Sequence, residues 1–215
     1  RRDFLRASAA ALVTATLMTT PSFRGHALAQ SGNSDIDILN YALTLEHLES
    51  RAYQNVNTIG LLSGPARDIF VDFGDQEAAH VVALTGTITQ LGGTPVRAQA
   101  TYNWPTFQNA QEVLTYFQML EELGAAAYLG QAPRLQSPEL LTAAVSIHNV
   151  EGQHAAILSD LIGVPPAPAF APAKTMEEVV AAITPILMPT GSMPSAMPNT
   201  GLGGGQQRRH RSHCE

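Results

Sequence analysis

The order of apolar and polar residues has a helical period in four long segments of the chain. In ILNYALTLEHLESRAYQNV (38–56), apolar residues recur every three or four positions, which places them on one face of a helix. Ser34, with Asp37 three residues later, forms the sequence pattern of a capping box and marks the start of this helix. The pattern therefore predicts a long amphipathic helix that begins at Ser34.

Capping residues and helix breakers delimit the remaining predicted helices, because serine and proline favour helix starts and glycine favours helix ends. The second helix follows Ser63-Gly64-Pro65 and ends at Gly92-Gly93, and the third follows Pro105-Thr106 and ends at about Leu129. The fourth begins at the N-cap Ser137 and ends at Gly163. A short fifth helix begins at Thr175, where Glu178 completes a capping box, and ends at about Leu187.

The lengths of the connections predict how the four long helices pack. Short loops join the first helix to the second and the third to the fourth, so each pair should form an antiparallel hairpin. The segment GGTPVRAQATYNWPT (92–106) is long enough to cross the length of a bundle. We therefore expect an all-α fold, a four-helix bundle over residues 30–164 with one long crossover. A Pro-rich linker and a short fifth helix would follow over 165–188.

Both ends of the chain have compositions of their own. Residues 1–29 combine Arg1-Arg2, a mildly apolar stretch and the cleavage pattern Ala27-Leu28-Ala29, which resembles a Tat-type export signal. The signal predicts a bacterial protein exported to the periplasm or beyond, with no stable membrane insertion after cleavage. An uncleaved N-terminal anchor is the alternative. Residues 189–215 are Pro/Gly-rich and basic at their end, and we expect them to be disordered.

Charge and cysteine content exclude several classes of function. The formal net charge is -6, and residues 30–205 hold 16 acidic against 5 basic residues, so the chain does not resemble a nucleic-acid-binding protein. Cys214 is the single cysteine, which excludes an internal disulfide and the Cys-x-x-Cys pairs of rubredoxin-type or zinc-ribbon sites. An acidic body suits a protein that handles cations.

The two predicted hairpins resemble each other in sequence. YALTLEHLESRAY (41–53) matches YFQMLEELGAAAY (116–128) at an offset of 75, and EAAHVVALTGTI (77–88) matches EGQHAAILSDLI (151–162) at an offset of 74. Chance similarity between amphipathic helices would explain shared leucines better than shared glutamates and histidines. The match indicates a duplicated helix pair.

The repeat selects among the glutamates on the inner faces of the helices. Glu46 matches Glu121, whereas Glu49 matches Gly124 and Glu122 matches His47. We therefore predict Glu46 and Glu121 as site residues and keep Glu49 and Glu122 as alternative ligands.

The residues that recur have the chemistry of a metal site. Buried carboxylates without partners cost several kcal/mol each, so four of them in a bundle core require cations. Two divalent cations would cancel four negative charges, and two neutral imidazoles would complete the ligands. One Glu from each of two helices with Glu-x-x-His from each of the other two is a known dinuclear pattern. The predicted ligands are Glu46, Glu77, His80, Glu121, Glu151 and His154.

Two tyrosines, Tyr53 and Tyr128, each follow a predicted ligand by seven residues and share its helix face. They are either core aromatics or hydrogen-bond partners of the carboxylates, and the sequence leaves both readings open. Oxygen and imidazole donors without thiolate favour iron first and manganese second, with zinc less indicated.

The motifs LNYALTLEHLESRAY, QEAAHVVAL, LEELGAAAYLG and IHNVEGQHAAIL resemble the ferritin-like superfamily over about residues 34–163. More narrowly, they are similar to exported ferritin-like domain proteins related to plant desiccation-associated proteins. The resemblance implies a di-iron or di-manganese carboxylate bundle with the six residues named above in ligand positions.

These observations predict a stress-protective oxidoreductase that oxidises Fe(II) with O2 or peroxide at a dinuclear centre. A non-enzymatic structural or desiccation protein, in which metal only stabilises the bundle, is the alternative, and an iron-storage cage subunit is a third. A homo-oligomer is compatible with each.

Overall fold

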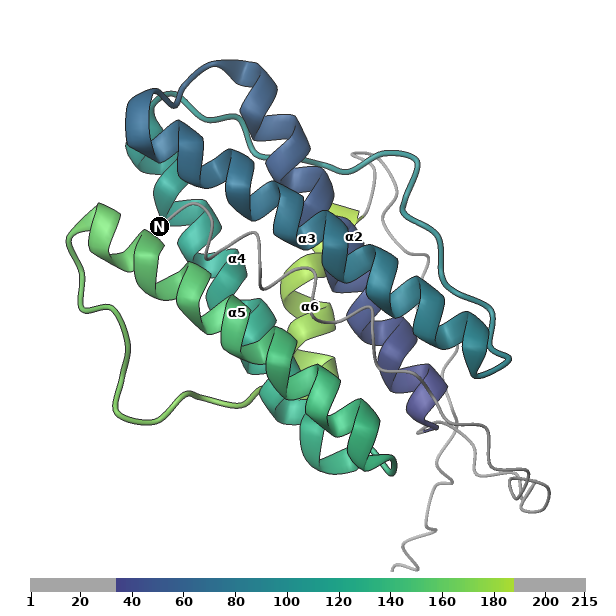
Figure 1. Ribbon diagram of the computed structural model, residues 1–215. Coiled ribbons are helices and arrows are strands. Elements are labelled where there is room, and N and C mark those ends of the chain that lie inside the picture. Colours follow the sequence, from purple (N-terminus) through teal and green to yellow (C-terminus); the bar gives the residue numbers. More distant parts are fainter. Residues whose placement is uncertain (1–33, 188–215) are drawn as a thin grey trace, which may run out of the picture.

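The computed structural model describes residues 34–187, and all regular secondary structure within that range is helical. Four long helices form two antiparallel hairpins, and a short helix follows them (Figure 1). The helices are α2 (Asp35–Ile59), α3 (Gly64–Gln90), α4 (Ala110–Gln131), α5 (Pro138–Ile162) and α6 (Met176–Leu187), with a 3-10 turn, η2 (Ala132–Arg134), between α4 and α5. The predicted fold class is confirmed. The predicted export signal (1–29) and the predicted tail (189–215) lie outside the described residues.

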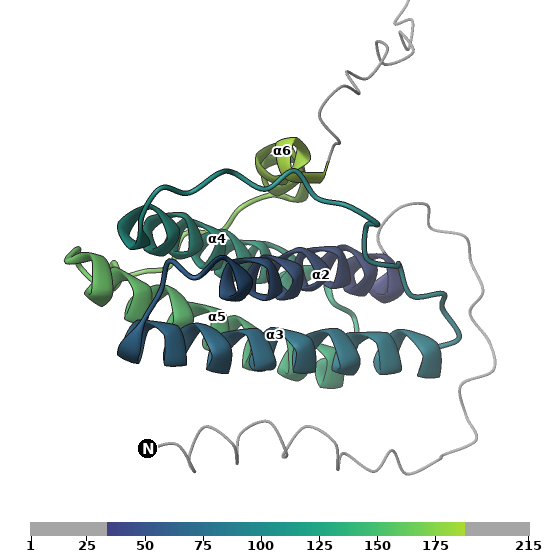
Figure 2. The same ribbon diagram turned by 90° about the horizontal axis from the view of Figure 1, so that it is seen from above.

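The helices are arranged in layers. Figure 2 shows α2 and α4 in one layer and α3 and α5 in the next, with α6 on the outer side of the first layer. The most extensive packing joins α2 to α3 and α4 to α5, so each long helix packs mainly against the other helix of its own hairpin. None of the helices within residues 34–187 is long and apolar enough to span a membrane.

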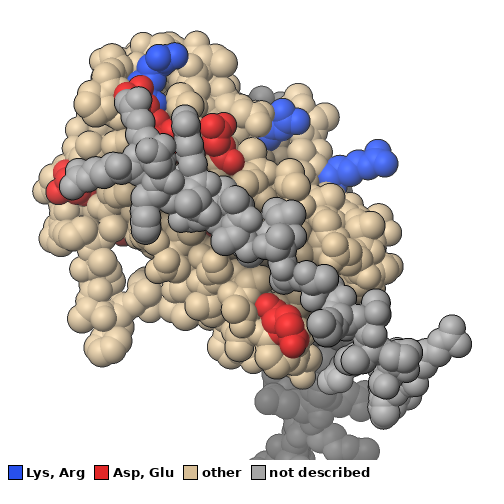
Figure 3. Space-filling model, viewed as in Figure 1, with Lys and Arg blue, Asp and Glu red and all other residues tan. Residues whose placement is uncertain are grey.

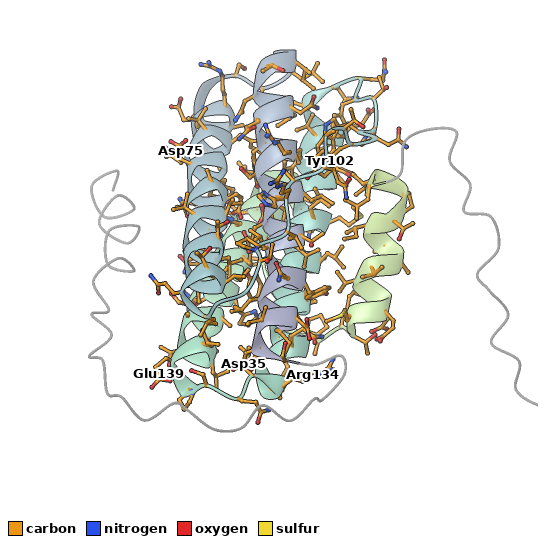
Figure 4. The ribbon with its side chains drawn as sticks, turned by 90° about the vertical axis from the view of Figure 1, so that its right-hand side faces the viewer. Asp35, Asp75, Tyr102, Arg134 and Glu139 are labelled. Atoms are coloured by element: carbon orange, nitrogen blue, oxygen red, sulfur yellow. The ribbon has the colours of Figure 1, made fainter. Side chains whose placement is uncertain are left out.

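Side-chain caps fix the helix starts. The hydroxyl of Ser34 accepts from the backbone N–H of Asp37, whose carboxylate accepts from the backbone N–H of Ser34, so the predicted capping box is present. The hydroxyl of Ser137 caps α5 by accepting from the backbone N–H of Leu140, and the backbone N–H groups of Gln136 and Ser137 donate to Asp35. Figure 4 shows Asp35, Arg134 and Glu139 together at this end of the bundle. This contact links the start of α2 to the turn between α4 and α5.

The start of α4 differs from the prediction. The sequence placed it after Pro105-Thr106, but the helix begins at Ala110, capped by Asn109. The side chain of Asn109 accepts from the N–H of Glu112, and the carboxylate of Glu112 accepts from the N–H of Gln108. These bonds cap the helix at Asn109 and not near Pro105, so the crossover is longer than predicted.

The crossover between α3 and α4 is tied to α2 and to α6. Asn40 of α2 donates to the carbonyl of Thr94 and accepts from the N–H of Val96. Near the other end of the crossover, Asn103 donates to carbonyls of α6. The crossover therefore holds α6 in place as well as connecting the hairpins.

A glycine lets the segment before α6 pass close to α4. The backbone N–H of Lys174 donates to the carbonyl of Ala126, and a Cβ at Gly130 would lie 1.9 Å from the carbonyl oxygen of Lys174. Only glycine permits this approach. From there, Val179 and Ile183 of α6 are buried against the bundle.

Gly130→Ala should therefore destabilise the protein, by about 1–3 kcal/mol, because the added methyl group forces the Lys174 backbone away from α4. Gly152→Ala is the matched control, since a Cβ there meets no atom within 4 Å and should stabilise α5 by about 0.5–1 kcal/mol. Urea unfolding of both variants measures the difference. Equal stabilities would contradict the close approach.

Candidate metal centre

Four carboxylates and two imidazoles meet in the middle of the bundle. α2 and α4 each contribute one glutamate, and α3 and α5 each contribute a glutamate and a histidine three residues later. These residues are 0–7% exposed, and they lie between two apolar core clusters, one toward each end of the bundle. They are the six residues that the sequence predicted as ligands: Glu46, Glu77, His80, Glu121, Glu151 and His154.

These side chains form two overlapping groups, each with four potential ligand atoms within 4.8 Å of one another. Glu46 and His80 belong to the first group, and Glu121 and His154 belong to the second. Glu77 and Glu151 belong to both. The geometry is that of two adjacent cation positions that share two carboxylates.

The imidazoles turn the same nitrogen toward the carboxylates. Nδ1 of His80 lies 3.1 Å from Oε2 of Glu46 and 3.1 Å from Oε2 of Glu77. Nδ1 of His154 lies 3.1 Å from Oε2 of Glu121 and 3.1 Å from Oε1 of Glu77. Each histidine therefore contacts Glu77, which both groups share, and the one glutamate that belongs to its own group alone.

The two tyrosines bind across the repeat. The hydroxyl of Tyr53 in α2 donates to Oε1 of Glu121 in α4, and the hydroxyl of Tyr128 in α4 donates to Oε1 of Glu46 in α2. Both are also core residues, and Tyr53 packs against Phe117 with ring centroids 4.5 Å apart. Both readings that the sequence left open therefore hold.

The alternative ligands separate in the structure. Glu122 is exposed on α4 and lies outside the cluster. Glu49 is 4% exposed, and its Oε1 lies near the Cα of Gly124 on the inner side of α4. The structure thus adds Glu49 to the buried carboxylates, although the repeat gave it no counterpart.

Two contacts of His154 were not predicted from the sequence. Oε1 of Gln76 lies 3.0 Å from Nε2 of His154, and the ring of Phe73 stacks on the imidazole at 3.8 Å. Such a partner fixes the orientation and tautomer of a ligating histidine. Gln76 corresponds to Val150 in the repeat, so only its position next to Glu77 could have indicated it.

Burial and mutual contacts shift the pKa values in opposite directions. Burial raises the pKa of Glu46 to about 7, against the lowering effect of His80. Burial and neighbouring carboxylates also raise the pKa values of Glu49 and Glu151 well above their ordinary range. Burial alone would raise the pKa of Glu77 too, but hydrogen bonds from His154 and His80 lower it below the ordinary value.

The imidazoles respond to the same charges. Burial lowers the pKa of His80, but Glu46 and Glu77 more than offset this and raise it to about 11. For His154, Glu121 and Glu77 offset burial and raise the pKa to about 9. In the absence of metal, imidazolium charges therefore balance part of the carboxylate charge.

The donor set fits metal ions. Among the described residues, neither oxygen of Glu151 accepts a hydrogen bond, although Nδ1 of His80 lies 3.5 Å from its Oε1, and Oε2 of Glu49 has no hydrogen-bond partner either. Buried carboxylate oxygens without partners are costly, and bound cations would satisfy them. Oxygen and imidazole ligands without thiolate suit iron or manganese.

The comparisons with known proteins agree with this fold. A family model for a ferritin-like domain matches residues 34–164, which include α2 to α5 and all six predicted ligands. No curated protein matches the chain.

Two solved structures are similar to the chain. A conserved hypothetical protein from Mycobacterium tuberculosis has a TM-score of 0.54 and 20% identity, over 63% of this chain and 94% of that chain. A structure described as ferritin-like, diiron-carboxylate proteins from Bacillus anthracis has a TM-score of 0.51 and 23% identity, over 59% and 94%. At these identities the likeness shows the fold alone. The narrower relation to desiccation-associated proteins stays a prediction.

The stability of the metal-free protein should fall as the pH rises from about 5 to about 9. The pKa of His80 rises from 6.5 to about 11 and that of Glu46 from 4.5 to about 7, so over this range the folded state keeps protons that the unfolded chain releases. The lowered pKa of Glu77 makes the stability rise with pH, but only below about pH 4.5, the ordinary pKa of its carboxyl group.

Thermal unfolding of chelator-treated protein at about pH 5.5 and about pH 8.5 checks the slope. The protein should melt at the lower temperature at pH 8.5, and His80→Gln should reduce the difference. A melting temperature that rises with pH would contradict the assignment of protons to the cluster.

Proposed function

The chain belongs to the ferritin-like domain family, and from this premise we propose that it holds a pair of metal ions and oxidises Fe(II) with dioxygen or hydrogen peroxide. Iron is the proposed metal, with manganese second. One observation carries the proposal: two groups of four ligands overlap in a shared pair of carboxylates, Glu77 and Glu151. A single cation would leave one of the two groups without a partner.

The enclosure of the cluster restricts what can react there. The six residues are at most 7% exposed, and His80 is the most exposed of them. Metal ions, dioxygen, peroxide and water are small enough to reach such a site. An organic substrate would require the helices to separate, so the enclosure supports a reaction between small inorganic species.

Bound metal ions would supply Lewis acidity and the capacity to exchange electrons with an oxidant. The chain's own residues keep the ligands in place. Tyr53 and Tyr128 occupy Oε1 of Glu121 and Glu46, which leaves Oε2 of each carboxylate directed at the cluster. The imidazoles must lose the proton at Nδ1 to bind a cation, so metal binding releases protons.

The outer nitrogen of His154 has a partner suited to this role. When Nε2–H donates to Oε1 of Gln76, the neutral imidazole presents an unprotonated Nδ1 to the cluster. Within residues 34–187, Nε2 of His80 makes no such hydrogen bond. The two halves of the site therefore differ, which supports two cation positions of unequal affinity.

A second candidate function is structural, with metal serving only to hold the bundle together. The position of the cluster favours it, because the cluster separates the two apolar core clusters and joins all four long helices. In that case metal removal would lower the melting temperature, but the loaded protein would not accelerate Fe(II) oxidation.

An iron-oxidation assay distinguishes the two functions. Wild-type protein should oxidise added Fe(II) faster than buffer. In E77Q/E151Q both shared carboxylates lose their charge, so the protein should bind metal at least on the order of 10–100-fold more weakly and lose this activity. E122Q is the matched control, because Glu122 is exposed outside the cluster and its loss should change neither property. Absorbance of the Fe(III) product and calorimetric metal titration measure both.

A wild-type protein that binds two metal ions but oxidises Fe(II) no faster than E77Q/E151Q would overturn the catalytic proposal. The structural function would then remain, and it would be supported by a large loss of melting temperature on metal removal.

A further inference from the structure

Glu49 is a buried carboxylate that the six-ligand arrangement does not use. It lies one turn after Glu46 and one turn before Tyr53 on the same face of α2. Glu46 belongs to one group of ligands, and Tyr53 donates to Glu121 of the other. Glu49 therefore projects between the two groups. It is 4% exposed, and its Oε2 is buried without a hydrogen-bond partner in the described part of the chain.

The facing residue on α4 is a glycine that makes room for this carboxylate. A Cβ at Gly124 would lie 2.8 Å from Oε1 of Glu49 and 2.6 Å from Oε2 of Glu151. Real Cβ atoms essentially never approach other atoms so closely. Oε1 of Glu49 and Oε2 of Glu151 thus both border the space that the missing side chain leaves.

Gly124 is also the counterpart of Glu49 in the repeat. The first hairpin carries a carboxylate at the position where the second carries only the hydrogen atom of a glycine. The residue that breaks the repeat, Glu49, and the residue that leaves space for it, Gly124, are therefore counterparts of each other. The substitution gives the cluster five carboxylates instead of four.

The fifth carboxylate changes the charge balance. Five carboxylates with neutral imidazoles carry five negative charges, and two divalent cations would leave one of them uncompensated. One divalent and one trivalent cation would balance all five. Neither imidazole offers compensation to Glu49, because Nδ1 of each contacts other carboxylates.

We propose that Glu49 is a further ligand of the metal pair, bound on the Gly124 side next to Glu151, and that it stabilises the higher oxidation state. This inference rests on the dinuclear centre of the proposed function. The alternative role for Glu49 is a neutral carboxylic acid that fills the core, and this role predicts no effect on the metal ions.

Glu49→Gln in the full chain tests the proposal, with Glu122→Gln as the matched control on the exposed side of α4. Calorimetric titration with Mn(II) should show about tenfold weaker binding of one of the two ions in E49Q and no change in E122Q. The midpoint potential of the iron-loaded protein should shift upward in E49Q alone, because a negative charge that favours Fe(III) is lost. The metal-free E49Q protein should melt no lower than wild type, since it lacks an unpartnered buried carboxylate.

Glu49→Asp provides a second test that keeps the charge but withdraws the oxygens, so it should also weaken Mn(II) binding. Mn(II) affinities and iron potentials of E49Q and E49D equal to those of E122Q would overturn the role of Glu49 while leaving the dinuclear centre intact. A wild-type protein that binds fewer than two Mn(II) ions would overturn the centre itself, and the role of Glu49 with it.

Discussion

The cost of burying carboxylates governs this structure. Glutamates from all four long helices converge at the centre of the bundle, where water cannot solvate them. Such charges are tolerated only when hydrogen bonds, imidazolium ions or metal ions compensate them. Tyr53, Tyr128 and the two histidines supply part of that compensation. Among the described residues, the oxygens left without a hydrogen bond from a neighbour include both oxygens of Glu151 and Oε2 of Glu49.

The duplicated hairpin explains how one chain builds such a cluster. Each copy provides one glutamate, one Glu-x-x-His pair and one tyrosine, and each tyrosine reaches the glutamate of the other copy. The copies are therefore joined by polar contacts across the core. On the face of the molecule drawn in Figure 3, charged side chains are scattered where the surface is uncovered, and they form no continuous patch of one sign there.

Much of this could be predicted from the sequence, because local signals determine it. The capping box at Ser34, the N-cap at Ser137 and the terminal glycines define helix ends through contacts within a few residues. The six clustered residues could be predicted because they recur at fixed offsets. The start of α4 was predicted too early, since Pro105 is a common helix-start signal whereas the two hydrogen bonds between Asn109 and Glu112 depend on side-chain geometry.

What could not be predicted depends on contacts between helices. The repeat did not indicate Glu49 as a ligand, because its counterpart is Gly124. In the structure, however, that glycine provides the space for the Glu49 carboxylate. The crossed tyrosine bonds and the contact of Gln76 with His154 likewise join residues on different helices. Some of these contacts involve a residue that differs between the two copies, and others join one copy to the other. Comparing the two copies in sequence therefore does not reveal them.

The central claim is that the bundle holds two metal ions that share Glu77 and Glu151. Anomalous diffraction from crystals of iron-loaded protein, collected at the iron absorption edge, tests it most directly. We expect two adjacent iron peaks, one contacting Glu46 and His80 and the other contacting Glu121 and His154. A single peak, or iron bound only outside the buried cluster, would contradict the account.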